Sequence, residues 1–202
     1  TDGFVGADWH GIGEILGARM LELCGKDTGN TGKIALLQGQ ATAAASVYQL
    51  NPIMAMYKDN PNIEVVSSQP ADWDASKARA ITQTVIAQHP DLCGIIGFWD
   101  GQDMGAAAAI KESGKDIKLV TSGGGSNSQA CNMLKNGTYD STASYQNILQ
   151  GHDINSLISI LLQSDAAAGE EKYMLYTPTK LITKENMNSD SCWDLENQFK
   201  YD

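Results

Sequence analysis

The sequence predicts an α/β fold built on a doubly wound parallel sheet, for two reasons. Short apolar runs typical of strands alternate five or six times with stretches of helical periodicity along the 202 residues. In addition, the run at 93–99 (CGIIGFW) is almost continuously apolar, as expected for a strand covered by helices on both faces. Such alternation implies right-handed parallel crossovers between the strands.

The predicted elements follow one another in a regular order. Residues 3–7 (GFVGA) form a short apolar run, and residues 9–24 place Ile12, Leu16 and Met20 at helical spacing. Further strands are expected at 33–39, 63–69, 93–99, 117–122 and 138–145, and further helices at 44–59, 74–88, 101–114 and 127–136. The helix at 74–88 ends at His89-Pro90 because a proline disfavours helical backbone in the residue before it.

The composition excludes several classes of partner. The chain carries 14 basic and 24 acidic residues, which leaves a formal net charge of −10. A chain this acidic, with no basic block, binds nucleic acid or an anionic membrane poorly. Its apolar fraction of 42% is too high for general disorder. No stretch approaches the ~18 apolar residues that span a bilayer.

No catalytic or metal-binding motif stands out. The three histidines, His10, His89 and His152, lie on different predicted elements. The G-x-S-x-G motif of α/β-hydrolases is absent from the sequence. We therefore predict a protein that is not an enzyme and needs no cofactor.

The four cysteines allow two interpretations. Cys24, Cys93, Cys131 and Cys192 are widely spaced and include no C-x-x-C pair, which excludes a zinc ribbon or a thioredoxin motif. Two disulfides and four buried thiols are equally compatible with the sequence. If disulfides form, we favour the pairs Cys24–Cys93 and Cys131–Cys192, because the first two cysteines should lie at the same end of the fold.

Aromatic residues gather where predicted strands end. Trp9, Trp73 and Trp99 follow such strands, as do two of the seven tyrosines, Tyr48 and Tyr145. In doubly wound sheets, ligands bind beyond the carboxyl ends of the strands. A ring beside a carboxylate, as at Trp73 and Trp99, suits a sugar or a polyol. Alternatively, the rings fill loop bases and the aspartates cap the following helices.

Three segments each resemble a motif of one protein family. Residues 68–74 (SQPADWD) match the strand-to-loop segment that carries a pocket aromatic residue in that family, and His-Pro-Asp at 89–91 follows at the spacing found in the family. Residues 5–8 (VGAD) match the start of a second lobe. Over about residues 4–187, the chain resembles the later part of the type I periplasmic solute-binding proteins of the ribose-binding-like group. The resemblance implies a receptor of two doubly wound lobes that closes on its ligand and docks on a membrane permease.

The resemblance also assigns positions in the ligand site. Trp73 matches the stacking aromatic residue, whereas the family's arginine, asparagine and later aspartate are replaced here by Tyr48, Trp99 and Gly123. These replacements remove charge and add rings, which favours a less polar, larger or cationic ligand such as a sugar derivative, an aryl glycoside or a polyol. The ligand-binding residues implied by the resemblance are Tyr48, Trp73, Trp99, Asp100, Gly123, Tyr145 and Gln146.

The resemblance further divides the chain into three parts. Residues 1–145 would form the ligand-binding lobe, 146–187 would cross toward the other lobe and return, and 188–202 would form a C-terminal tail. The N-terminal part of the second lobe would be missing, since each lobe needs roughly 100 to 150 residues. The helix at 147–163 would then present an apolar face to that missing lobe or to a second copy of the chain.

The sequence thus predicts the substrate-binding component of an ABC uptake transporter. We expect a periplasmic or secreted protein that captures a sugar or sugar-like solute and delivers it to the permease. The alternative function is the effector-binding domain of a transcription regulator, or the ectodomain of a sensor with the same fold.

Overall fold

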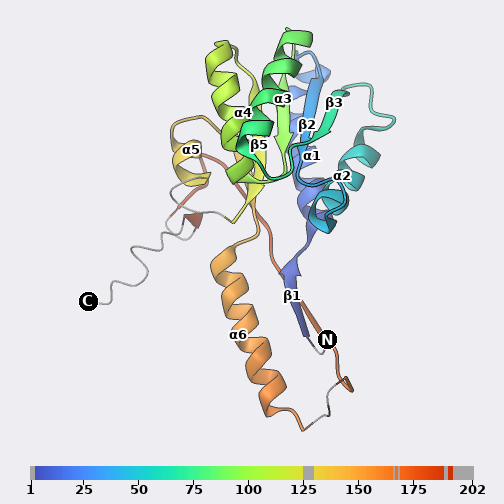
Figure 1. Cartoon of the computed structure of the whole chain (residues 1–202), viewed down its shortest axis with the longest axis vertical. Helices are drawn as coiled ribbons and strands as arrows, with labels where there is room; N and C mark the ends of the chain where they lie inside the picture. Colours follow the sequence, from blue (N-terminus) through green and yellow to red (C-terminus); the bar gives the residue numbers. More distant parts are fainter. Residues whose placement is uncertain (1–2, 125–129, 166, 168, 189–190, 193–202) are drawn as a thin grey trace, which may run out of the picture.

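The computed structural model describes residues 3–124, 130–165, 167, 169–188 and 191–192. The main feature is a six-stranded sheet with the strand order β3-β2-β4-β5-β6-β8 (Figure 1). Neighbouring strands run parallel except β8, which is antiparallel to β6. The predicted α/β fold with a parallel sheet is confirmed. The strands are β2 (Lys33–Gln38), β3 (Glu64–Pro70), β4 (Gly94–Gly97), β5 (Lys118–Gly123), β6 (Ser141–Ser144) and β8 (Lys180–Ile182).

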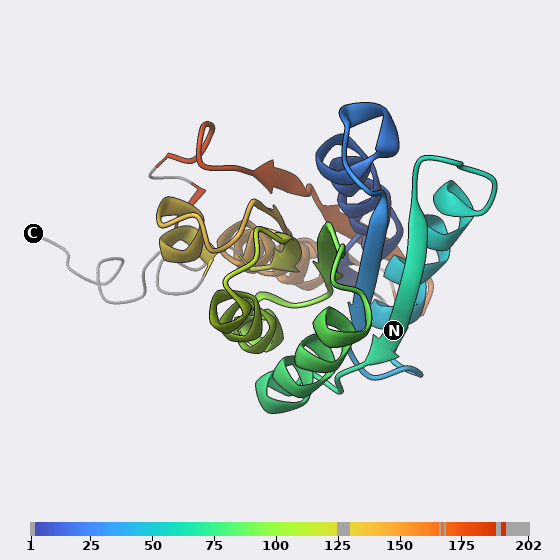
Figure 2. The ribbon, with the colours of Figure 1, turned by 90° about the horizontal axis from the view of Figure 1, so that it is seen from above.

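Helices cover both faces of this sheet (Figure 2). The pair α1 (Trp9–Cys24) and α2 (Ala44–Tyr57) packs on one face, and the pair α3 (Ala75–Gln88) and α4 (Asp100–Ser113) packs on the other. All four helices were expected from the apolar periodicity of the sequence, and their ends lie within two residues of the predicted ones. Two layers of helices leave the strands buried on both sides, which explains their continuous apolar character.

Successive side chains along a strand belong to two different hydrophobic cores, one on each face of the sheet. Ala35 and Leu37 of β2 pack with α3 and α4, whereas Ile34 and Leu36 of the same strand pack with α1 and α2. This follows from the period of two in a β-strand, which sends successive side chains to opposite faces. Strand β2, between β3 and β4, therefore contributes to both cores.

The strand order places a topological switch point between β2 and β4. From β2 the chain crosses to β3 at one edge, and it then returns past β2 to build β4, β5 and β6 on the other side. The loops after β2 and β4 therefore leave in opposite directions, and a crevice forms between them at the carboxyl ends of the strands.

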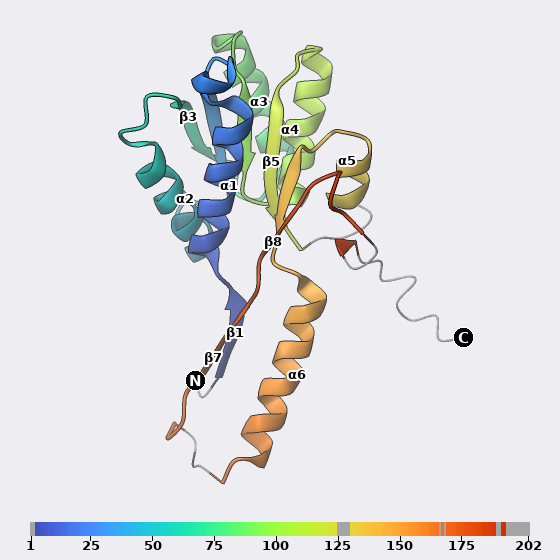
Figure 3. The same ribbon diagram turned by 180° about the vertical axis from the view of Figure 1, so that it is seen from behind.

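The first strand lies outside the main sheet. The predicted strand at 3–7 exists as β1 (Gly3–Ala7), but it pairs in parallel with β7 (Tyr173–Thr177) in a separate two-stranded sheet. The sequence pattern predicts this strand but not the sheet that it joins. Helix α6 (Asn147–Gln163) extends away from the carboxyl edge of the main sheet. The chain then returns as β7, which lies beside β1 (Figures 1 and 3).

Two other elements differ from the sequence-based expectation. The returning part of the segment 146–187 contains two strands, β7 and β8, on either side of Pro178, which has no N–H to continue a ladder. The helix expected at 127–136 is α5 (Asn132–Lys135), and residues 125–129 lie outside the described residues. The sequence pattern does not predict the 3-10 helix η1 (Lys26–Thr28) after α1. The domain boundaries at 145 and 187 stay predictions, and most of 188–202 is outside the described residues.

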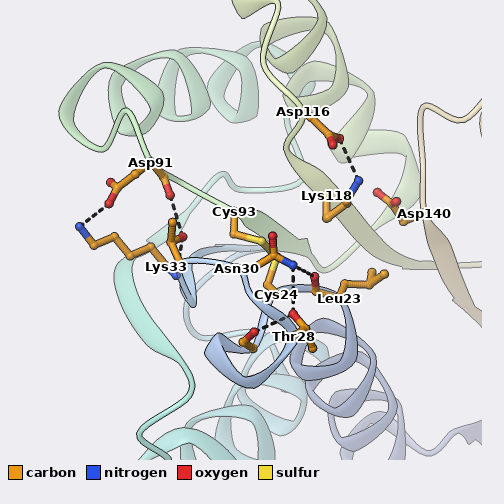
Figure 4. Close-up of a disulfide and its surroundings, with 12 residues drawn as sticks. Leu23, Cys24, Thr28, Asn30, Lys33, Asp91, Cys93, Asp116, Lys118 and Asp140 are labelled. Carbon is orange, nitrogen blue, oxygen red and sulfur yellow. Dashed lines mark hydrogen bonds and ion pairs between the residues drawn. A yellow bond between two sulfur atoms is a disulfide. The ribbon is translucent and has the colours of Figure 1, made fainter.

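Both favoured cysteine pairs are confirmed as disulfides. Cys24 at the end of α1 is bonded to Cys93 just before β4, at the amino end of the sheet (Figure 4). Beside it, the ammonium group of Lys33 lies 2.8 Å from an Asp91 carboxylate oxygen. This ion pair raises the pKa of Lys33 and lowers the pKa of Asp91, chiefly through the side-chain hydrogen bond between the two groups.

The second disulfide joins two distant segments of the chain. Cys131, fully buried just before α5, is bonded to Cys192. Ser191 is also held here, because its hydroxyl accepts a hydrogen bond of 3.0 Å from the Lys180 ammonium of β8. The disulfide therefore fixes the start of the predicted tail against the far edge of the sheet.

Candidate functional site

Aromatic side chains surround a cavity of about 270 Å³ beyond the carboxyl ends of the strands. We call it the aromatic pocket. Its walls come from separate loops and helix starts, after β1, β2, β3, β4 and β6. The described residues that line it are Trp9, Ala45, Trp73, Phe98, Trp99 and Tyr145.

One side of the pocket is formed by Trp9 and Tyr145. Their rings pack edge to face, with centroids 5.4 Å apart and an interplanar angle of 68°. Trp9 is the first residue of α1, and the preceding Asp8 caps this helix by accepting a hydrogen bond of 3.0 Å from the Gly11 N–H. Tyr145 directly follows β6, which fixes its backbone beside the sheet.

Trp73 and Trp99 form a second pair of lining rings. These rings are also arranged edge to face, at 6.5 Å and 82°. Trp73 and the preceding Asp72 both adopt left-handed backbone, with φ of 62° and 55°. Such backbone is uncommon for residues other than glycine, and the neighbouring structure must hold it in place. This turn carries the indole over the end of β2.

Buried carboxyl groups lie behind the pocket wall. Asp100, the first residue of α4, is 3% exposed, and its carboxylate packs against Gly123 at the end of β5. Burial raises its pKa to about 6, although hydrogen bonds from backbone N–H groups oppose the shift. The Tyr139 hydroxyl donates a hydrogen bond of 2.6 Å to the Asp100 carbonyl. Burial also raises the pKa of Tyr145 to about 12, with a contribution from Asp100.

A second carboxyl group lies deeper in the same helix. Asp103 is fully buried, and burial raises its pKa to about 8. The Thr121 hydroxyl of β5 donates a hydrogen bond to its Oδ2 atom. Its side chain fills the space beside Gly97, where an ideal Cβ would lie 2.0 Å from the carboxyl carbon. Burial therefore favours the protonated, uncharged form of Asp103, and the side chain is a polar link between α4 and the sheet.

A sequence profile described as a periplasmic binding protein domain matches residues 1–166. The chain belongs to the periplasmic binding protein family. The doubly wound sheet, with its pocket at the carboxyl edge, agrees with this assignment.

Known relatives of this periplasmic binding protein include sugar-binding proteins. The D-allose-binding periplasmic protein of Escherichia coli strain K12 is 31% identical over 111 residues, which are 55% of this chain and 36% of that protein. The D-ribose/D-allose-binding protein of Pseudomonas aeruginosa is 26% identical over 187 residues, which are 89% of this chain and 56% of that protein.

The chain is also similar to a solved structure of a solute-binding protein with a bound sugar. An ABC transporter solute-binding protein from Agrobacterium vitis with bound D-fucose is 26% identical to this periplasmic binding protein and has a TM-score of 0.75. The comparison covers 92% of this chain and 61% of that chain. The chain thus spans less than two thirds of the length of each of these three relatives.

The fold of this binding protein brings together three of the ligand-binding residues expected from the sequence. Trp73, Trp99 and Tyr145 line the aromatic pocket. Asp100 lies behind it, where its carboxylate meets the backbone of Gly123. Their role in ligand binding stays a prediction.

The remaining two expected residues point elsewhere. Tyr48 lies on α2 with 55% of its surface exposed, and it is not among the described residues that line the pocket. Gln146 has left-handed backbone at the start of α6, and its amide donates a hydrogen bond of 2.5 Å to the Pro178 carbonyl. It therefore links the two segments that leave and re-enter the main sheet.

Three lining residues are absent from the expected set: Trp9, Ala45 and Phe98. Trp9 could have been chosen from the sequence, since it follows a predicted strand, but the family's ligand motifs do not point to it. Ala45 and Phe98 carry no such signal, because a small residue in a helix and an apolar residue in a strand are typical of a core.

The described part of the binding protein contains no group of three or more His, Cys, Asp or Glu residues that could hold a metal ion. None of its described helices combines the length and the apolar character needed to cross a membrane.

Proposed function

We propose that this chain is the substrate-binding part of an ABC uptake receptor and that it captures a sugar or sugar-like solute in the aromatic pocket. The observation that carries the proposal is the meeting of five rings from four strand ends around one cavity of about 270 Å³. An indole face packs against the apolar C–H face of a sugar ring, while polar groups nearby orient its hydroxyls. The names of the relatives, which bind allose, ribose and fucose, support the sugar class.

The composition of the pocket favours a less polar ligand than a simple pentose or hexose. Its described lining residues include no charged side chain, and their polar side-chain groups are the tyrosine hydroxyl and the indole N–H groups of the three tryptophans. The carboxyl group of Asp100, the residue after Trp99, is almost completely buried. A sugar derivative or a glycoside with an apolar substituent would use such a surface fully.

The disulfides bear on the cellular location of the protein. Two disulfides with no free thiol suit an oxidising compartment, which supports a periplasmic or secreted location over a cytoplasmic transcription regulator. In that location the partner of the loaded receptor would be the membrane permease. We propose no catalytic role for the chain.

A second partner is proposed at α6. Ile154, Ile158 and Leu162 form one stripe along this helix, and Leu162 is 81% exposed. In the described part of the chain these side chains and Met174 of β7 stay exposed, which leaves apolar surface on α6 and on the two-stranded sheet. We assign this face to a second lobe of the complete receptor. Without that lobe the chain should self-associate.

A ligand screen tests the sugar-binding proposal. Thermal unfolding would be followed with D-allose, D-ribose, D-fucose, polyols, aryl glycosides and a quaternary amine, and at least one sugar or glycoside should raise the midpoint. Trp73→Ala and Trp99→Ala should each weaken binding by roughly 1 to 3 kcal/mol through lost stacking and burial.

The matched control for these variants is Tyr176→Ala, which removes an exposed ring on β7 away from the pocket. It should leave the ligand-induced shift unchanged. Absence of any shift in the wild type, or a shift insensitive to both tryptophan substitutions, would contradict the proposed site.

Light scattering tests the α6 face. The wild-type chain should form dimers or larger species, and the double variant I158E/L162E should be monomeric because two charges interrupt the apolar stripe. A wild-type chain that is monomeric at all concentrations would show that this face needs no partner.

A further inference from the structure

Gln102 occupies an unusual place between the aromatic pocket and the core. It is the third residue of α4 and is completely buried, although its amide has two polar ends that must find partners there. Its Oε1 atom accepts a hydrogen bond of 2.9 Å from the backbone N–H of Trp73. The amide therefore reaches from α4 across the sheet edge to the loop that follows β3.

The surroundings also fix which end of the amide is oxygen. The Nε2 atom of Gln102 donates to two acceptors at 3.4 Å, the Leu37 carbonyl of β2 and the Asp103 Oδ1 atom. Only the Oε1 end can then face the N–H donor of Trp73. A single buried side chain thus links α4, the end of β2 and the pocket loop.

The loop needs such a link because its conformation is a rare one. Asp72 and Trp73 are two consecutive left-handed residues that are not glycine. Backbone hydrogen bonds hold the two sides of this turn, from the Ala71 N–H to the Gln38 carbonyl and from the Asp74 N–H to the Ala71 carbonyl, both at 2.9 Å. The bond to Gln102 holds the residue that carries the indole.

We propose that Gln102 is the positioning residue of the aromatic pocket, since its amide keeps the backbone of Trp73 in the left-handed turn that sets the indole against Trp99. This role rests on the proposed function only where ligand binding is concerned. The arrangement of the two rings in the free protein is a separate consequence and can be measured without a ligand.

Spectroscopy of the free protein tests the proposal. Gln102→Met keeps the volume of the side chain but removes the acceptor for the Trp73 N–H. We expect a changed near-UV circular dichroism spectrum, because the edge-to-face pair Trp73–Trp99 is lost, and stronger quenching of tryptophan fluorescence by acrylamide. Far-UV spectra first confirm that the variant is folded.

Gln49→Met is the matched control. Gln49 is also completely buried, and its amide donates 2.9 Å to the Ala45 carbonyl and accepts 3.0 Å from the Ser122 hydroxyl. The substitution removes a buried amide whose hydrogen bonds go to Ala45 of the pocket lining and to Ser122, and not to the loop that carries Trp73. It should destabilise the protein to a similar extent and leave the Trp73–Trp99 signal as in the wild type.

Two further variants separate positioning from general packing. In a Trp73→Phe background, Gln102→Met should produce little additional spectral change. Gln102→Glu should restore the wild-type spectrum at about pH 5, where burial keeps the new carboxyl group neutral and its carbonyl oxygen can accept from the Trp73 N–H. If Gln102→Met does not fold, Gln102→Asn serves instead, because its shorter amide does not reach Trp73.

A wild-type spectrum in Gln102→Met would overturn the proposal, as would an equal spectral change in the Trp73→Phe background. For the sugar that stabilises the wild type in the screen, Gln102→Met should raise the Kd about 5- to 10-fold, the effect of one lost hydrogen bond. If no sugar binds the wild type, the proposed function fails, while the spectra still decide the role of Gln102.

Discussion

The indole of Trp73 occupies the space that a side chain at position 39 would need. An ideal Cβ placed on Gly39 lies 2.0 Å from both Cη2 and Cζ2 of that ring. Gly39 follows β2 directly, so the close approach of Trp73 to the sheet depends on the absence of a side chain at the end of this strand. The shape of the pocket therefore depends on a glycine that is not among the described residues that line it.

Gly39→Ala should displace Trp73 from the pocket. A methyl group cannot be accommodated at 2.0 Å from ring atoms, so the indole must move outward. We expect a loss of the Trp73–Trp99 near-UV signal and a stability loss of about 1 to 3 kcal/mol in urea unfolding.

Gly151→Ala is the matched control for this substitution. No atom lies within 4 Å of an ideal Cβ at Gly151, which is inside α6, so this variant should gain about 0.5 to 1 kcal/mol of stability from helix propensity. An unchanged near-UV spectrum in Gly39→Ala would show that the indole is not held against the strand.

Gly105→Ala should destabilise the lobe by separating α3 from α4. An ideal Cβ at Gly105 lies 1.7 Å from the carbonyl oxygen of Ala75, a backbone atom that cannot rotate away. The two helices must shift apart, and we expect a loss of about 2 to 3 kcal/mol, measured by urea unfolding at pH 7. A loss below about 0.5 kcal/mol would mean that these helices have room between them.

The stability of the protein should fall as the pH rises from about 5 to 7. The pKa of Asp103 is about 8 in the fold because of burial, against 3.8 for the free side chain, so the native state keeps a proton that the unfolded state has released. The native state binds more protons in this range, and the free energy of unfolding therefore falls with pH, by up to about 1.4 kcal/mol per unit for one proton. Asp100, with a pKa of about 6, adds to the slope below that pH.

Asp103→Asn isolates this contribution. The amide has no proton to release in this range and can still accept the hydrogen bond from the Thr121 hydroxyl, so the slope of unfolding free energy against pH should be smaller than in the wild type. Asp116→Asn is the control, since 87% of that side chain is exposed. Equal slopes in the wild type and Asp103→Asn would exclude Asp103 as the buried acid.

Removal of the Cys24–Cys93 disulfide should cost about 4 kcal/mol of stability. The bond closes a segment of 69 residues, and a crosslink over such a length strongly restricts the unfolded chain. Urea unfolding of the double variant C24A/C93A measures the loss. Thiol titration of the denatured wild type should find no free thiol before reduction and four after it, and any free thiol before reduction would contradict the pairing.

Much of the fold could be predicted from the residues alone. The alternation of apolar runs with helical periodicity predicts the α-helices and strands between residues 9 and 123, since the period of the apolar side chains separates a helix from a strand. The pairing of Cys24 with Cys93 followed from the same reasoning, because the end of α1 and the start of β4 must both lie at the amino edge of the sheet.

Only the tertiary structure decided which strand ends meet. β1 and β7 are far apart in sequence, and their pairing depends on the path of α6, which no local pattern encodes. For the same reason the sequence indicated Trp73, Trp99 and Tyr145 but not Ala45 or Phe98, which line the pocket through packing. The sequence by itself determined the family, the layers of helices on the two faces of the sheet, and the aromatic residues that follow several strands. The contact of Gln102 with Trp73, and the exposed position of Tyr48, depend on long-range geometry that is formed only when the sheet assembles.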